Sequence, residues 1–188
     1  LSPAQALGLG CALRIGPDIL RQRGFKPTQS GNGWLLSSAI ADPGRDFMLR
    51  AVAARGGYVN EPAESIYPAA VTDSSGARLD GRNRYRIRFA PGQFPPVGAF
   101  WSITAYNLES RLVENPLGRY AIGDRTAGLR YGRDGSLDIV LSASPPREGT
   151  RNWLPIPPGG FNLVARLYLP RPEALDGRYL LPPIERIE

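Results

Sequence analysis

Two acidic residues, Glu114 and Asp124, bracket the segment of this chain that is richest in side chains able to do chemistry, residues 114 to 125. Paired carboxyl groups can act as general acid and base in glycoside hydrolysis when they are held about 5 to 9 Å apart. Glu114 and Asp124 are therefore candidate catalytic residues of a carboxylate-dependent, glycosidase-like hydrolase.

The same segment, with a second one near residue 152, also carries side chains that can hold a polar ligand. An arginine presents a planar fork of donors that suits anionic or polyhydroxylated groups. Aromatic rings offer faces on which the rings of a ligand can stack. The candidate ligand-binding residues are Asn115, Arg119, Tyr120, Arg125, Asn152 and Trp153.

A structural interpretation of these residues stands beside the functional one. Asn115-Pro116 and Gly118 are turn formers, and Asp124 next to Arg125 suits an ion pair at a corner of the fold. Ion-pair networks and loop geometry bring such residues together without catalysis. A general acid needs a desolvated carboxyl group with a raised pKa, whereas a structural carboxylate pairs with a cation or a turn.

Composition excludes several other chemistries. The 188 residues include no histidine, which rules out Ser-His-Asp and Cys-His triads and imidazole-ligated metals. Cys11 has no second cysteine to pair with, and Lys26 is the only lysine available for a Schiff base. Residues 134 to 138 alternate oxygen donors but lack the bidentate glutamate of a calcium loop, so a turn is favoured. We expect no metal site and no cofactor.

The net charge of +6 comes almost entirely from arginine. Arg84, Arg86 and Arg88 alternate with apolar residues, which is the period of a β-strand with one face in water. This pattern favours a solvated strand face over a phosphate-binding stripe, and we predict no nucleic-acid partner. No stretch is apolar over the roughly 18 residues that a membrane helix needs.

The elements that would position these residues fall into two parts. Before residue 65, apolar residues recur at helical spacing, and Asp42-Pro43 and Gly56-Gly57 mark the start and end of one helix. After residue 65 the period is two, and strands are predicted over 66–72, 85–89, 100–106, 137–141 and 161–169, with an Asp134-Gly135 hairpin turn. This predicts a helical lead-in or linker segment over 1–65, followed by a β-sandwich domain over 66–188.

The predicted fold class is mainly β, an antiparallel jelly-roll-like β-sandwich preceded by a short helical segment. The predicted core includes Tyr85, Ile87, Phe89, Ile103, Ile139, Leu163 and Leu167.

Six blocks of sequence occur in an order that is specific: residues 79–85 (LDGRNRY), 95–104 (PPVGAFWSIT), 114–125 (ENPLGRYAIGDR), 134–137 (DGSL), 152–155 (NWLP) and 161–168 (FNLVARLY). Together they resemble the C-terminal domain of bacterial proteins that carry two adjoining domains of unknown function, numbered 1254 and 1214. The resemblance covers about residues 32 to 188. It implies a jelly-roll-like sandwich, an additional N-terminal β domain outside these residues, and an exported protein.

These observations favour a binding or assembly module over an enzyme, because the commonest general base is missing from the chain. The expected partners are the additional N-terminal domain or a second copy of the chain, and the expected ligand is a carbohydrate. Residue 1 is leucine and the only methionine is Met48, so we expect a fragment or a processed piece of a longer protein. The expected location is periplasmic or secreted.

Overall fold

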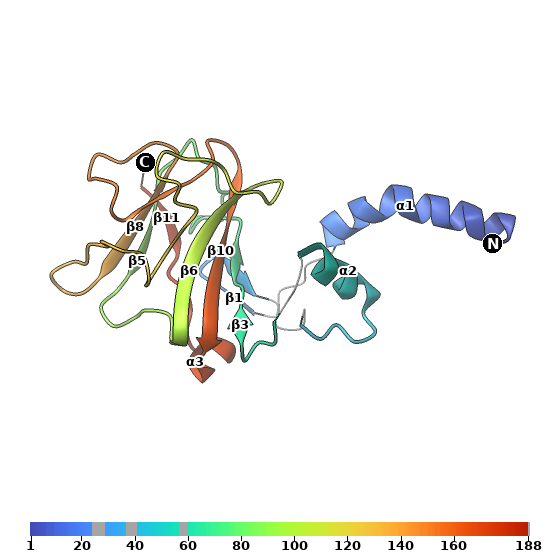
Figure 1. Cartoon of the computed structure of the whole chain (residues 1–188), viewed down its shortest axis with the longest axis horizontal. Coiled ribbons are helices and arrows are strands. Elements are labelled where there is room, and N and C mark those ends of the chain that lie inside the picture. Colours follow the sequence, from blue (N-terminus) through green and yellow to red (C-terminus); the bar gives the residue numbers. More distant parts are fainter. Residues whose placement is uncertain (24–28, 37–40, 57–59, 188) are drawn as a thin grey trace.

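The computed structural model describes residues 1–23, 29–36, 41–56 and 60–187. Two β-sheets pack face to face, and two helices from the N-terminal part of the chain stand clear of them (Figure 1). The elements are α1 (Pro3–Arg23), β1 (Gln29–Gly31), β2 (Trp34–Leu36), α2 (Phe47–Gly56), β3 (Ser65–Ile66), β4 (Ala69–Ala70), β5 (Tyr85–Phe89), β6 (Val97–Asn107), β7 (Ala121–Gly123), β8 (Leu137–Ser142), β9 (Trp153–Pro155), β10 (Phe161–Pro170), α3 (Pro172–Leu175) and β11 (Ile184–Arg186).

The larger sheet has the strand order β1-β2-β4-β10-β6-β7, and β3 also pairs with β10. The smaller sheet has the order β11-β5-β8-β9. The pairings of the described strands are antiparallel except that of β8 with β9, which is parallel. The predicted fold class, mainly β with two sheets behind a helical segment, is confirmed.

The hydrophobic core lies between the two sheets, as the period-two pattern requires. Along β10, Phe161, Leu163, Ala165 and Leu167 are buried, while the alternate positions are only partly covered. The rings of Phe89 in the smaller sheet and Trp101 in the larger sheet lie 4.8 Å apart between their centroids. All seven residues predicted to form the core are buried: Tyr85, Ile87, Phe89, Ile103, Ile139, Leu163 and Leu167.

Leu169 departs from the predicted face of β10. Its side chain is 52% exposed, and its backbone has the left-handed φ of 50°. The register with β6 shifts between Tyr168 and Pro170, which marks a bulge at this point. A bulge inserts one residue into the ladder and turns the following side chain out of the alternation. Leu169 is therefore exposed, although an unbroken period of two over the predicted strand 161–169 would place it on the core face.

The Asp134-Gly135 turn forms, and Gly135 takes the positive φ of 85° that favours glycine. It does not make a hairpin, however. β8 pairs with β5 and β9, whereas β7, the preceding strand in the chain, belongs to the larger sheet. The hairpin prediction is wrong because a turn motif reverses the chain locally but does not choose the strand with which β8 pairs.

The strand predicted over 66–72 is divided into β3 and β4, with Pro68 between them. Both short strands pair with β10, Ile66 opposite Leu167 and Ala70 opposite Leu163. Proline has no N–H to donate to the ladder, although the Pro68 carbonyl still accepts a hydrogen bond from the Ala165 N–H at 2.8 Å. The interruption follows from this one residue.

Residues before 65 contribute strands as well as helices. α2 begins at Phe47, where the Asp46 carboxylate accepts a hydrogen bond from the Leu49 N–H at 2.9 Å, so the helix starts later than the Asp42-Pro43 signal predicted. Gly57, the second residue of the predicted stop, lies outside the described residues. β2 pairs with β4, and the buried indole of Trp34 donates to the Pro182 carbonyl at 2.8 Å. The segment predicted as a helical lead-in therefore also supplies two strands to the larger sheet.

Candidate functional site

The segment from Glu114 to Tyr120 is a loop that leads from β6 to β7, and Asn115 organises it. The Asn115 side-chain oxygen accepts hydrogen bonds from the N–H groups of Leu117 and Arg119 at 3.2 and 3.0 Å. Its amide nitrogen donates to the Arg119 carbonyl at 3.0 Å. Gly118 has a φ of 56°, which suits a tight turn. Asn115 therefore holds the shape of the loop through both ends of its amide.

Arg119 joins this loop to the segment that precedes and enters β9. Its Nη1 lies 2.7 Å from the carbonyl oxygen of Thr150, 3.0 Å from that of Arg151 and 2.8 Å from that of Trp153. Arg119 and Trp153, which were candidate residues from two separate parts of the sequence, are thus brought into direct contact. The contact is made to the backbone of residue 153, not to its indole ring.

Replacing Arg119 with glutamine is expected to lower the free energy of unfolding by about 1.5 to 3 kcal/mol, the usual range for hydrogen bonds that involve a charged group. The reason is that the shorter side chain loses the three carbonyl contacts and frees the segment before β9. Urea unfolding followed by tryptophan fluorescence measures the change.

Arg147 supplies the matched control. It is exposed and has no polar partner among the described residues, so Arg147→Gln should leave the free energy of unfolding unchanged within about 0.5 kcal/mol. Equal stabilities of the two variants would contradict the role assigned to Arg119.

The two candidate catalytic carboxylates have different surroundings. The Asp124 carboxylate accepts a hydrogen bond from the Trp101 backbone N–H at 3.1 Å, which connects the end of β7 to β6. Glu114 is exposed. Within the described part of the chain no ion pair joins Asp124 to Arg125, whose guanidinium instead lies 4.1 Å from the centre of the Phe100 ring. Asp124 has a structural contact, and the catalytic pairing of Glu114 with Asp124 stays a prediction.

Asn152 and Trp153 are held by the fold on the side of the smaller sheet. The Asn152 side chain accepts a hydrogen bond from the Arg130 N–H at 2.8 Å and donates to the carbonyls of Arg130 and Asp138 at 2.6 and 3.0 Å. The Trp153 indole is fully buried and donates to the Ser142 carbonyl at 3.0 Å. Its ring has no exposed face in this conformation, so a ligand cannot stack on it. Tyr120, the remaining candidate, is half-buried.

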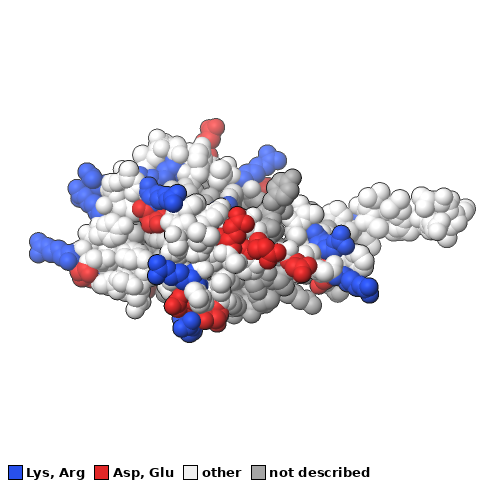
Figure 2. Space-filling view, turned by 60° about the horizontal axis from the view of Figure 1, so that its bottom comes forward, with Lys and Arg blue, Asp and Glu red and all other residues white. Residues whose placement is uncertain are grey.

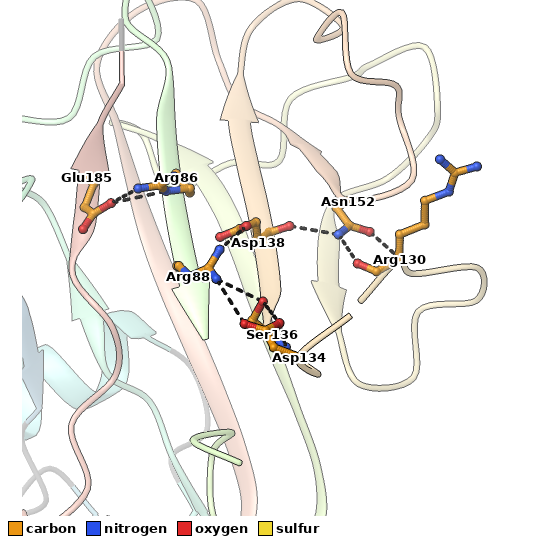
Figure 3. A network of polar contacts seen from close by, with 8 residues as sticks. All are labelled: Arg86, Arg88, Arg130, Asp134, Ser136, Asp138, Asn152 and Glu185. Carbon is orange, nitrogen blue, oxygen red and sulfur yellow. Dashed lines mark hydrogen bonds and ion pairs between the residues drawn. The ribbon is translucent and has the colours of Figure 1, made fainter. Parts of the chain in front are cut away.

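The arginines of the alternating stripe pair with carboxylates of neighbouring segments (Figure 3). Arg86 contacts Glu185 of β11 at 2.7 Å, and Arg88 contacts Asp138 of β8 at 2.6 Å. The Ser136 hydroxyl and N–H, together with the Arg88 guanidinium, hold the pKa of the Asp134 carboxyl below its usual value. Because Arg86 and Arg88 are already paired with carboxylates, their positive charge is not free to bind a phosphate. This agrees with the predicted solvated strand face.

The outer face of the larger sheet carries a group of side chains of which only Arg125 was a candidate site residue from the sequence. The rings of Phe100 on β6 and Tyr168 on β10 are stacked with their centroids 4.4 Å apart. Next to them Arg166 donates to the Thr104 hydroxyl at 2.8 Å and to the Tyr106 hydroxyl at 2.6 Å. We call this group, with Arg125 over Phe100, the β6–β10 face; it comprises Phe100, Ser102, Tyr106, Arg125, Arg166 and Tyr168.

Period-two alternation would have shown that these side chains point away from the core. It does not show that β6 and β10 are neighbours, because that pairing joins residues far apart in the chain. The sequence therefore did not predict this face as a whole, because the order of the strands in the sheet was not known.

Neither a metal-binding cluster nor a membrane-spanning helix is found among the described residues. Within the described residues, no group of three or more histidine, cysteine, aspartate or glutamate side chains is placed to hold a metal ion. Among the described helices, none is both long and apolar enough to cross a membrane.

The fold and the site define a class of protein, a two-sheet β-sandwich with a helical N-terminal segment. The model of a family described as protein of unknown function (DUF1214) matches residues 64–172, which is more than half of the chain. The chain belongs to this family. The 1214 part of the resemblance is thereby confirmed, while the adjoining 1254 domain stays a prediction.

Solved structures give a second comparison. The VPA0106 protein from Vibrio parahaemolyticus is 27% identical to this chain with a TM-score of 0.64, and the match covers 100% of this chain and 46% of that one. This chain thus spans less than half the length of that relative. An uncharacterized protein from Burkholderia cenocepacia is 28% identical over 68% of this chain and 30% of its own, with a TM-score of 0.40. No curated protein matches the chain.

Proposed function

We propose that this chain is an assembly module whose N-terminal helix docks onto a further β domain of the same polypeptide. The observation that carries the proposal is the exposure of apolar side chains along α1. Leu7 is 71% exposed, Leu13 is 72% exposed and Ile15 is 50% exposed. Exposed apolar patches of this kind mark interaction surfaces.

The apolar residues of α1 face more than one direction. Leu7, Cys11, Ile15 and Ile19 follow one another at i, i+4 spacing, and Leu9 and Leu13 form a second row on another side of the helix. A helix that is apolar on several sides is usually enclosed by protein. Burying one leucine or isoleucine side chain contributes about 1.5 to 3 kcal/mol, so covering these rows would stabilise a docked state substantially.

The arrangement of the chain leaves α1 free to make that contact. α1 and α2 extend beyond the β3 side of the sandwich (Figure 1). The outer part of α1 shows no charged side chains in the view of Figure 2, whereas the sandwich surface carries many.

The comparison with solved structures favours a further domain of the same polypeptide as the partner that covers α1. The match with the Vibrio protein includes the whole of this chain, α1 among it, and leaves more than half of that protein outside. The resemblance to proteins with an adjoining 1254 domain supports the same occupant.

Cys11 offers a direct test, because it is the only cysteine, is exposed and lies in one of the apolar rows. The measurement is the rate at which a maleimide reagent labels Cys11 in residues 1–188 alone and in the complete gene product that contains them. Labelling should be fast in the isolated chain and at least about tenfold slower in the complete product, because docking covers the thiol.

The control is a variant with Leu9→Glu and Leu13→Glu in the complete product. These charges oppose burial of α1 and should restore fast labelling without unfolding the sandwich. Equal labelling of Cys11 in the short and the complete wild-type chains would refute the proposal.

A further inference from the structure

The β6–β10 face is a continuous surface formed by two neighbouring strands. Their register places Phe100 opposite Tyr168 and Ser102 opposite Arg166, so the outward side chains of these four positions adjoin one another. Arg125 follows β7 and reaches over the Phe100 ring at 4.1 Å. The result is a row of guanidinium, aromatic and hydroxyl groups on the outside of the larger sheet.

The two arginines of this face lack carboxylate partners. Arg125 contacts the Phe100 ring, and Arg166 donates only to the neutral hydroxyls of Thr104 and Tyr106; among the described residues, neither forms an ion pair. The smaller sheet differs, since its outward arginines Arg86 and Arg88 are both paired with acidic side chains. The β6–β10 face therefore carries two guanidinium groups that form no ion pair within the described residues, although the Glu64 carboxylate lies near enough to act on Tyr168.

These arginines are also oriented before any ligand arrives. Stacking on Phe100 limits the rotation of the Arg125 guanidinium, and two hydrogen bonds hold that of Arg166. A guanidinium held in place loses less entropy when it binds a carboxylate through its planar fork. Both positions suit an anion whose charged groups are spaced along its length.

The remaining side chains indicate the rest of the ligand. Ser102 and Tyr106 place hydroxyl groups beside the arginines, and these can bond to the hydroxyl groups of a sugar, whereas the Tyr168 hydroxyl is hydrogen-bonded to Tyr67. The outside of a sheet suits an extended ligand, because compact small molecules require a concave pocket. Positive charge, hydroxyl groups and an extended surface together match a polymer of acidic sugars.

We infer that the β6–β10 face binds a carboxylated polysaccharide, with Arg125 and Arg166 each receiving a carboxylate and the neighbouring hydroxyl groups contacting the sugar ring. This site is separate from the docking surface on α1, and its function does not depend on the docking of that helix. It is also distinct from the loop at residues 114–120, where Asn115 and Arg119 are occupied by backbone contacts.

Isothermal titration of residues 1–188 with oligogalacturonate, and with neutral maltooligosaccharide of the same length, tests the inference. We expect binding to oligogalacturonate only, weakened by added salt because exposed charges are screened. Arg125→Gln and Arg166→Gln should each weaken binding by about tenfold or more, which corresponds to about 1.4 kcal/mol. Ser102→Glu, which places a negative charge between the two arginines, should abolish it.

Arg86→Gln is the matched control, because it removes an arginine of the opposite sheet that already has a carboxylate partner. Its affinity for oligogalacturonate should equal that of the wild type. A thermal unfolding scan of each variant shows whether the fold is intact.

The inference would be overturned by a folded wild type that does not bind oligogalacturonate, by equal binding of the neutral sugar, or by an equal loss of affinity in Arg86→Gln. A polyglutamate peptide that binds as tightly as oligogalacturonate would also overturn it, and would assign the face to an acidic protein segment.

Discussion

Alanine at position 81 is expected to destabilise the sandwich by about 3 kcal/mol or more, a large part of the 5 to 15 kcal/mol that stabilises a typical domain. A Cβ atom on Gly81 would lie 1.7 Å from the Pro157 carbonyl oxygen and 2.8 Å from the carbonyl carbon of the same residue. Both obstacles are backbone atoms, which cannot rotate away as a side chain does. Relief of the overlap would break the hydrogen bond from the Gly81 N–H to the Gly159 carbonyl, which is 2.9 Å long.

The matched control for this substitution is in the opposing segment. A Cβ on Gly159 would meet no atom within 4 Å, and the backbone of Gly159 does not have a positive φ. Gly159→Ala should therefore change the free energy of unfolding by no more than about 0.5 kcal/mol. Urea unfolding compares the two variants, and a Gly81→Ala protein as stable as Gly159→Ala would show that the two segments are not packed as described.

Truncation of Trp153 to alanine should cost about 3 to 5 kcal/mol of unfolding free energy, as is usual for a large buried ring. The indole is fully buried on β9, and its N–H is the partner of the Ser142 carbonyl at 3.0 Å. The alanine variant leaves a cavity and removes one of the two hydrogen bonds that the Ser142 carbonyl accepts, the other coming from the Ile156 N–H at 3.2 Å. Urea unfolding followed by circular dichroism, which does not depend on the missing indole, measures the loss.

Trp153→Phe separates the two contributions. Phenylalanine keeps much of the apolar volume but removes the N–H, so a smaller loss of about 1 to 3 kcal/mol is expected. A residue that stacks on a ligand from the surface can be truncated with little change in stability. If Trp153→Ala unfolds at the same urea concentration as the wild type, Trp153 belongs to such a surface and not to the core.

The same distinction, between a structural role and a ligand-binding role, applies to the other candidate ligand-binding residues. Asn115 directs its polar atoms to backbone groups of its own loop, and Arg119 and Asn152 direct theirs to backbone groups of other segments. Asparagine and arginine are favoured both at turns and at binding sites, so residue type alone left the two interpretations open. The hydrogen-bond partner of each polar atom distinguishes the structural role from the ligand-binding role. That partner is known only from the folded chain.

The strands were largely predictable, because each depends on nearby residues. β5 has the predicted bounds of Tyr85–Phe89, and its side chains alternate between core and solvent along the whole strand. The exceptions are local as well. Pro68 separates β3 from β4, and the bulge near Leu169 turns that side chain outward.

The sequence by itself determined the mainly β class, the core face of most strands and the chemistries that a chain without histidine excludes. These properties follow from residue type and from the period of two, which are set within a few residues. Only the tertiary structure decided that Arg86 and Arg88 have carboxylate partners, whereas Arg125 and Arg166 have none within the part of the chain that the structure describes. Such pairings join distant segments, and the order of strands in each sheet is selected by how the whole core packs, which no local pattern records.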